Sequence, residues 1–337
     1  MIERKTWRRW QRSTGLAVGL VAVAVALAAC GSGASSGSAP GAAPGAGERD
    51  TAAPPPLPSG PAGANAPAQG NCTQQVSGAA GLRQALGSAG PGDTICLAGD
   101  LSNVRLTVDR GGSAERPIIV RGDGRIVTKG ISVEADNVIV DGFVAQRPEA
   151  PGAALKGSNI TLRNTTINSP REGDGDGIRF WGSNIKIVHN TVTDTSNATG
   201  AHADCMQTYA TDEDNPASQD IVIDSNRCEK IDNNCLIAEG PNSSAGDGSG
   251  DGETRNITFS NNFCDNKASQ AVLADDVRNM TITNNEIVGN LDHAFAFQNE
   301  STNGVVSGNR ISSVQYEVGM DDSSENAYNG PRPGGAP

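Results

Sequence analysis

Carboxylates and one histidine recur at the start of three short apolar stretches in the second half of the chain. The three sequences are Asp174-Gly175-Asp176-Gly177, His202-Ala203-Asp204-Cys205 and Asp232-Asn233-Asn234-Cys235. Carboxylates that lie close together either raise the pKa of one of them or require a cation, and both outcomes are typical of functional sites. We therefore expect one external patch with Asp176, His202 and Asp204 as catalytic candidates. The alternative is that these Asp-Gly sequences are ordinary turns before a strand.

Polar and aromatic side chains within and just after these stretches extend the patch. Arg179 and Gln207 alternate with apolar neighbours, which predicts that they point outward and join the catalytic candidates. Trp181, Tyr209 and Glu239 share one further outward position. Aromatic rings beside carboxylates are typical of sugar-binding clefts, and these three residues are candidates for substrate binding. Packing beneath the inserted loops, roughly residues 195–219 and 239–255, is the alternative.

The elements that must position these residues belong to a repeat. An Asn or Asp followed by alternating apolar residues begins at residues Asn137, Asn159, Asn184, Asp220, Asn256, Asn279 and Asn303, at intervals of 22, 25, 36, 36, 23 and 24 residues. A base period of about 23 residues indicates a solenoid, and the alternation indicates short strands. A second asparagine, at 190, 226, 262, 285 and 309, keeps one register in five successive coils. Asparagine tolerates the left-handed turn conformation and stacks through its amide.

The repeat resembles that of right-handed parallel β-helix proteins of the pectin-lyase-like superfamily, over about residues 71–320. The resemblance implies an all-β solenoid of about nine coils. Gly78 to Ala89 has an amphipathic helical pattern and is expected to cap the N-terminal end, because unpaired strand edges require a cover.

Asp174-Gly175-Asp176-Gly177 and Ala203-Asp204-Cys205 also resemble motifs of polygalacturonase-type glycoside hydrolases, and the match implies Asp176 and Asp204 as the retained carboxylates. The sequence departs from that pattern at Ala203 and lacks the later Gly-His-Gly and Arg-x-Lys motifs. Hydrolysis therefore stays open beside elimination by a lyase, in which Arg179 or His202 would act. Ca²⁺ is then a possible cofactor, with Asp174 and Asp232 as its added metal ligands.

Six cysteines of the expected exported domain predict disulfides. Cys228 and Cys264 share one register of the repeat, and so do Cys205 and Cys235. Residues in one register of neighbouring coils lie about 4.8 Å apart, within the Cα range of a disulfide. We therefore expect the pairs Cys205–Cys235 and Cys228–Cys264, and we expect Cys72–Cys96 to close the N-terminal cap. The alternative is that Cys228 and Cys264 are unlinked, buried apolar side chains.

The N-terminal 29 residues have the pattern of a bacterial lipoprotein signal peptide, with a basic start, an apolar stretch and Leu27-Ala28-Ala29-Cys30. Cys30 is the expected lipidation site. Residues 30–70 are a linker rich in Ala, Gly, Pro and Ser that is expected to be disordered, and 321–337 are expected to form a disordered tail. The predicted location is the outer face of the cell membrane, with contact to the membrane through the lipid only.

Composition narrows the class of protein. The formal net charge of −12, without a basic stripe beyond the N-terminus, excludes nucleic acid as a partner. Abundant Gly, Asn, Thr and Asp exclude a helical bundle. Together these observations predict a monomeric cell-surface carbohydrate-active enzyme, a polysaccharide lyase or glycoside hydrolase, with an extracellular polysaccharide as its partner. The alternative is a non-catalytic β-helix lipoprotein that binds glycan or acts as a spacer.

Overall fold

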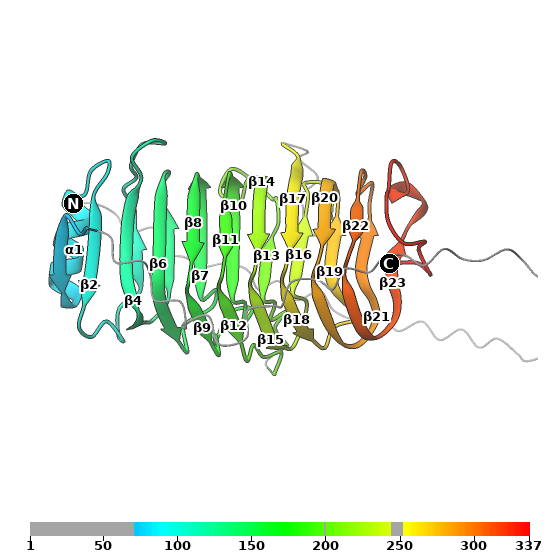
Figure 1. Cartoon of the computed structure of the whole chain (residues 1–337), viewed down its shortest axis with the longest axis horizontal. Coiled ribbons are helices and arrows are strands. Elements are labelled where there is room, and N and C mark those ends of the chain that lie inside the picture. Colours follow the sequence, from blue (N-terminus) through cyan, green and yellow to red (C-terminus); the bar gives the residue numbers. More distant parts are fainter. Residues whose placement is uncertain (1–70, 199, 244–251) are drawn as a thin grey trace, which may run out of the picture. The chain divides into compact units, whose positions relative to one another are not determined.

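The computed structural model describes residues 71–198, 200–243 and 252–337, which form a right-handed parallel β-helix. Successive coils place equivalent strands side by side (Figure 1). The first sheet is a ladder of ten strands: β1 (Gln74–Ser77), β2 (Thr94–Ala98), β4 (Ile118–Thr128), β6 (Val138–Gln146), β8 (Ile160–Arg163), β11 (Lys186–Val188), β14 (Gln219–Asp224), β17 (Thr254–Ser260), β20 (Val277–Thr283) and β22 (Val305–Ser307). The all-β solenoid predicted from the repeat is confirmed.

The second sheet continues from the ends of β4 and β6. Its further strands are β9 (Thr166–Asn168), β12 (Thr191–Thr193), β15 (Arg227–Ile231), β18 (Phe263–Asn266), β21 (Glu286–Gln298) and β23 (Arg310–Met320).

The third sheet bears the candidate site. It consists of β3 (Leu106–Val108), β5 (Ile131–Glu134), β7 (Ala153–Ser158), β10 (Ile178–Ser183), β13 (Met206–Thr208), β16 (Leu236–Glu239), β19 (Gln270–Asp275) and the later halves of β21 and β23. Alternate side chains of all three sheets point inward and form one continuous apolar core.

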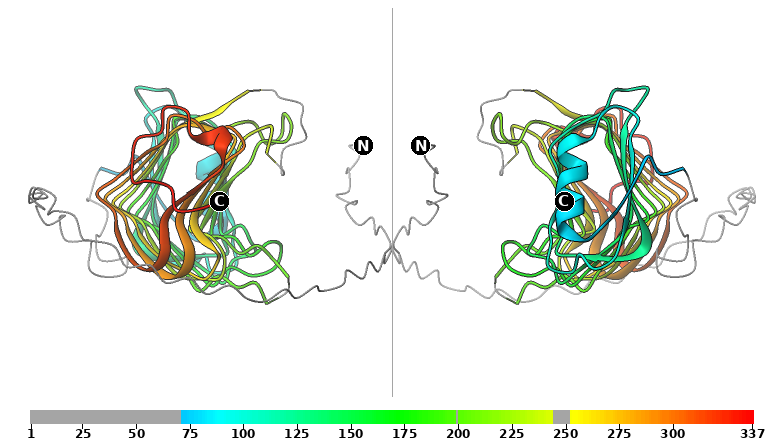
Figure 2. Two further views of the ribbon diagram at one scale, coloured as in Figure 1. Left: turned by 90° about the vertical axis from the view of Figure 1, so that its right-hand side faces the viewer. Right: turned by 90° about the vertical axis from the view of Figure 1, so that its left-hand side faces the viewer.

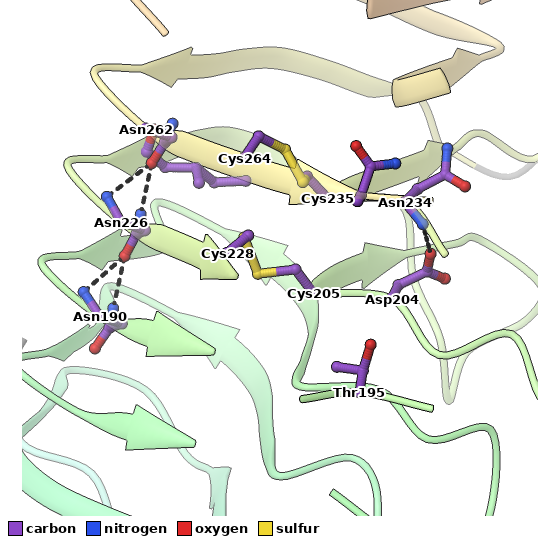
Figure 3. The surroundings of a disulfide bond; sticks show 12 residues. Asn190, Thr195, Asp204, Cys205, Asn226, Cys228, Asn234, Cys235, Asn262 and Cys264 are labelled. Atoms are coloured by element: carbon purple, nitrogen blue, oxygen red, sulfur yellow. Dashed lines mark hydrogen bonds between the residues drawn. A yellow bond between two sulfur atoms is a disulfide. The ribbon is translucent and has the colours of Figure 1, made fainter. Parts of the chain in front are cut away.

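Stacked asparagine amides fix one corner of the coils (Figure 3). Asn226 Oδ1 accepts hydrogen bonds from the backbone N–H of Asn190, at 2.9 Å, and from its Nδ2, at 3.1 Å. The same pair of bonds links each later member to the next, through Asn262, Asn285 and Asn309. The left-handed conformation lies one residue earlier than expected, at the residue before each stacked asparagine, for example φ 57° at His189 and 56° at Ser225.

Replacing Asn226 by alanine is expected to lower the free energy of unfolding by about 2–4 kcal/mol. The change leaves the buried N–H of Asn190 without its acceptor and removes the side-chain hydrogen bond to the Ile187 carbonyl, and each such buried loss costs about 1–3 kcal/mol. Chemical denaturation would measure the loss. Asn168→Ala, which removes an exposed amide contact to Gln146, is the matched control, and an equal effect of the two changes would contradict the prediction.

The disulfides follow the coil register but not the expected pairing. Cys72–Cys96 is confirmed, whereas the other two bonds are Cys205–Cys228 and Cys235–Cys264 (Figure 3). The predicted pairs Cys205–Cys235 and Cys228–Cys264 are therefore wrong, although Cys228 and Cys264 are strand partners as the register required. All four side chains point into the core, and those of successive coils lie parallel to each other. The inward thiols of one coil instead face each other across the interior, with Cα–Cα distances of 5.8 and 6.1 Å.

Both ends of the described solenoid are covered. Helix α1 (Gly78–Ser88) buries Leu82, Ala85 and Leu86 against the first coil, as predicted, and lies across that end in Figure 2. The expectation of a disordered tail at 321–337 is wrong. This segment forms the 3₁₀ helix η2 (Asp322–Ser324), bridges β22 at Asn329 and packs Tyr328 on Phe297. Its apolar and backbone groups cover the last coil, which a count of Gly and Pro does not reveal.

The expected signal peptide, Cys30 and the linker lie outside the described residues. Within the part of the chain that is described, no helix is long and apolar enough to cross a membrane.

Candidate functional site

The candidate site lies on the outer face of the third sheet. Ile178, Phe180 and Met206 belong to the core, whereas Arg179, Trp181 and Gln207 alternate with them and face outward. Residues 194–205 lead into β13 at one edge of this face, and residues 209–218 leave it at the other. The green loops in Figure 2 project from these two corners. The insertions seen in the sequence therefore flank the outward side chains.

Arg179 is held by two carboxylates from the turn before its own strand. Its Nε donates to Asp176 Oδ2 at 2.6 Å, and its Nη2 donates to Asp174 Oδ2 at 2.5 Å. The guanidinium also lies over the ring of Tyr209, 5.5 Å from the centroid. Its orientation is thus set by an ion-pair fork and a cation–π contact.

Asp176 and Asp204 form a buried column at the corner before the third sheet. Asp204 N–H donates to Asp176 Oδ1 at 2.9 Å, and Asp204 Oδ1 accepts from the N–H of Asn234 at 2.9 Å. Figure 3 shows the second of these bonds between neighbouring coils. Both carboxylates are completely buried. The expected external patch of Asp176, His202 and Asp204 is therefore wrong: the two carboxylates bind the turns of successive coils to one another.

Burial dominates the ionisation of this column. It raises the pKa of Asp204 well above the ordinary value, and the negative charge of Asp176 raises it further. Burial also raises the pKa of Asp176, to about 6, against the effect of Arg179. Asp204 Oδ2 has no hydrogen-bond partner among the described residues, whereas both oxygens of Asp176 have one. Burial and the neighbouring negative charge therefore favour the protonated form of Asp204.

His202 and Gln207 take different places from each other. The His202 side chain is exposed, and in the described part of the chain it makes no hydrogen bond or ion pair with the buried carboxylates. Gln207 is the β13 neighbour of Arg179, so these two side chains do lie together on the outer face. Gln207 is nearly covered, and its Oε1 has no partner among the described residues.

Glu239 presents the chemistry that best suits proton transfer. The residue is 8% exposed, and its carboxylate has no hydrogen bond or ion pair among the described residues. Burial raises its pKa to about 7, the neighbouring Asp275 adds to the rise, and Arg179 opposes it. A carboxyl group with this pKa exchanges protons readily at neutral pH.

Asp275 is the strand partner of Glu239 and is differently surrounded. Its two oxygens accept from Gln298 Nε2 at 2.8 Å and Asn299 Nδ2 at 2.6 Å. Two neighbouring carboxyl groups in unlike environments are typical of acid–base sites. Asp275 was absent from the predicted site residues, although it shares the outward register of Glu239 and Gln298, which is the signal that identifies it.

The aromatic pair is only partly available to a ligand. Trp181 is buried, lies 5.4 Å from the Tyr209 ring in an edge-to-face contact, and donates from Nε1 to the Tyr209 carbonyl at 2.9 Å. The expected exposed pair is therefore corrected: Trp181 supports the loop that begins at Tyr209, and the half-buried Tyr209 ring borders the face.

The candidate metal ligands Asp174 and Asp232 engage separate cations. Asp174 pairs with Arg179, and Asp232 Oδ1 pairs with Lys267 Nζ at 2.7 Å. Asp232 instead lines a pocket of about 440 Å³ beside the β12–β13 loop, which does not include Arg179, Gln207 or Glu239. We place the candidate site on the sheet face because its outward groups, unlike those of the pocket, combine burial with free acid–base capacity.

The fold and this face define the class as a parallel β-helix protein with an arginine–carboxylate site on one outer sheet. The chain belongs to the NosD family: the family model described as periplasmic copper-binding protein (NosD) matches residues 156–329, just over half of the chain. A search of curated proteins by sequence found no match.

Solved structures share the fold at low sequence identity. Pectate lyase Pel9A is 13% identical with a TM-score of 0.54, and the match covers 80% of this chain and 82% of Pel9A. A mannuronic acid specific polysaccharide family 6 lyase from human gut microbiota is 14% identical with a TM-score of 0.55, covering 71% and 58%. The family 6 alginate lyase AlyGC is 13% identical with a TM-score of 0.47, covering 73% of this chain but only 40% of that enzyme.

The described residues do not supply the donors that copper prefers, which are imidazole, thiolate and thioether groups. All six described cysteines form disulfides, and Met206, Met280 and Met320 are buried in the core. The three histidines lie apart, in a turn, in the β12–β13 loop and on β21. No group of three or more His, Cys, Asp or Glu side chains in the described ranges is placed to hold a metal ion. The residues therefore do not fit the copper of the family description.

Proposed function

We propose that the protein is a carbohydrate-active enzyme and that the outer face of β10, β13, β16 and β19 is its active site. Glu239 is the proton-transfer group, and Arg179, whose charge acts on Glu239, is the fixed donor on the same face. The carboxyl group of Glu239, which is buried and has no hydrogen-bond or ion-pair partner within residues 71–198, 200–243 and 252–337, carries the proposal, because such a side chain is retained at a free-energy cost that function explains better than packing.

The surroundings of Glu239 fit an extended ligand. The strands of the face stack side by side along the solenoid, and loops border two of its edges. Tyr209 offers part of an aromatic ring at the border, and sugar rings pack their apolar faces on such rings. Pel9A and the gut lyase, which share the fold, are named for action on polysaccharides. Hydrolysis and elimination both require proton transfer at the glycosidic unit, and Glu239 serves either reaction.

The purified protein should cleave at least one member of a broad glycan panel. New reducing ends would report either reaction, and the absorbance of unsaturated products would report elimination alone. Assays with chelator and with added Ca²⁺ would test the expected role of that cation. Binding without cleavage would favour the non-catalytic glycan-binding alternative, and absence of both would reject the proposed function.

The proposed location is the outer face of the membrane, through a lipid on Cys30. Cys30→Ser should release the protein from the membrane fraction or leave it unprocessed, because the thiol accepts the lipid and precedes the cleavage point. Fractionation followed by mass spectrometry of the N-terminus would measure both outcomes. Cleavage and membrane association that persist in Cys30→Ser would contradict the anchor.

A further inference from the structure

We infer that the site accepts a glycan without negative charge, neutral or amino-bearing, rather than a polyuronate. The inference rests on the proposed function and adds the substrate class. It arises from the charge balance of the third-sheet face and from the hydrogen-bonding groups that this face leaves open.

Two cations point outward from the described strands of this face, Arg179 and Lys156, and each has a carboxylate for a neighbour. Arg179 is engaged by both Asp174 and Asp176. Lys156 lies over the Trp181 ring, 5.8 Å from the centroid, and Glu134 is its strand partner on β5. A uronate carboxylate would therefore compete with protein carboxylates for each cation.

Two further carboxyl groups of this face form no ion pair in the described part of the chain. Asp275 is held by the amides of Gln298 and Asn299, and Glu239 has no hydrogen-bond or ion-pair partner among the described residues. They are strand partners, so their charges reinforce each other. A polyuronate brings one carboxylate with every sugar and would be repelled along this stretch, since like charges in contact cost several kcal/mol.

The open hydrogen-bonding capacity also favours a donor ligand. Above its raised pKa the Glu239 carboxylate is ionised and only accepts hydrogen bonds, and its oxygens have no donor among the described residues. Sugar hydroxyl and ammonium groups donate to such oxygens, whereas the carboxylate that each uronate unit also carries cannot donate and is repelled. The same face thus attracts hydroxyl-rich or amino-bearing chains and disfavours acidic ones.

Binding constants for three classes of oligosaccharide would test the substrate class: uncharged glycans, glucosamine oligomers, and uronate oligomers from alginate and pectin. The measurements use the purified protein in chelator, at low and at high salt. The uronate oligomers should bind at least about tenfold more weakly than the best oligomer of the other classes. High salt should narrow this gap, because it screens the repulsion.

At low salt, the double variant Glu239→Gln/Asp275→Asn should reduce the difference in affinity between uronate oligomers and the best oligomer of the other classes. Glu229→Gln, on the second sheet, should leave this difference unchanged. A melting temperature checks that the double variant folds, and the single change Asp275→Asn gives an independent reading. Uronate binding as tight as that of the other classes would overturn the inference and leave the proposed function intact. Failure of all three classes to bind would overturn both.

Discussion

Replacing Glu239 by glutamine is expected to reduce glycan cleavage by about 10²–10⁴-fold, the usual contribution of an acid–base group. Glutamine preserves the size and packing of the side chain but can neither lose nor supply a proton at neutral pH. Because the Glu239 carboxylate makes no hydrogen bond or ion pair in the described structure, the melting temperature should hold or rise. Initial rates on the best substrate of the glycan panel, with thermal unfolding beside them, would measure both quantities.

The pH profile gives a second reading of the same group. Burial raises the pKa of Glu239 to about 7, so kcat/KM should change with pH around that value, which gives one limb of the pH profile. If Glu239 is a general acid, kcat/KM falls above this pH, and if it is a general base, kcat/KM falls below this pH. Asp275→Asn should move the limb to lower pH because a neighbouring negative charge is lost. Arg179→Gln should move it to higher pH because a cation is lost.

Opposite displacements by these two variants would identify Glu239 as the titrating group, since both neighbours act on its charge. Glu229→Gln is the matched control, because Glu229 is a half-exposed acidic residue of β15 paired with Arg227. Full activity of Glu239→Gln would show that Glu239 does not transfer the proton. The same conclusion would follow if neither Asp275→Asn nor Arg179→Gln moved the pH limb of kcat/KM.

The fold was accessible from the sequence because a solenoid repeats its constraints. Left-handed corners and alternating inward apolar residues recur from coil to coil, and five successive coils add a stacked asparagine amide, so the same residue types return at regular spacing. The register derived from that spacing is confirmed, for example Ile178 with Met206 and Leu236 with Val272. It also placed Arg179 and Gln207 side by side on one outer face.

The depth of each side chain was not accessible in the same way. A register fixes which residues are neighbours along the stack, but the Asp-Gly turns could face solvent or fold inward. Asp176 and Asp204 turn inward because the N–H groups of the following coil need acceptors there. The cysteines show the same limit: the register was right for Cys228 and Cys264, yet the facing thiol of one coil, not the stacked one, forms the bond.

The buried column makes a prediction for stability. The folded-state pKa of Asp204 is raised above its unfolded value, so the native state favours the protonated form. The stabilising contribution of protonated Asp204 to the free energy of unfolding is therefore fully present below about pH 4. It is lost as the pH rises through the raised pKa of the folded state. Asp204→Asn should remove this loss, because an amide imitates the protonated acid and Asn234 already occupies the equivalent place in the next coil.

At pH 8 the variant Asp204→Asn should unfold at higher denaturant concentration than the wild type, and near pH 4 the two should coincide. Each unit by which the native pKa is raised corresponds to about 1.4 kcal/mol of unfolding free energy. Asp141→Asn is the contrasting control: that buried carboxylate pairs with Arg163 at 2.9 Å and accepts from Asn164, so its removal should destabilise the protein at pH 8. If Asp204→Asn instead lost stability at pH 8 as Asp141→Asn does, the native column would favour the ionised form of Asp204, contrary to the prediction.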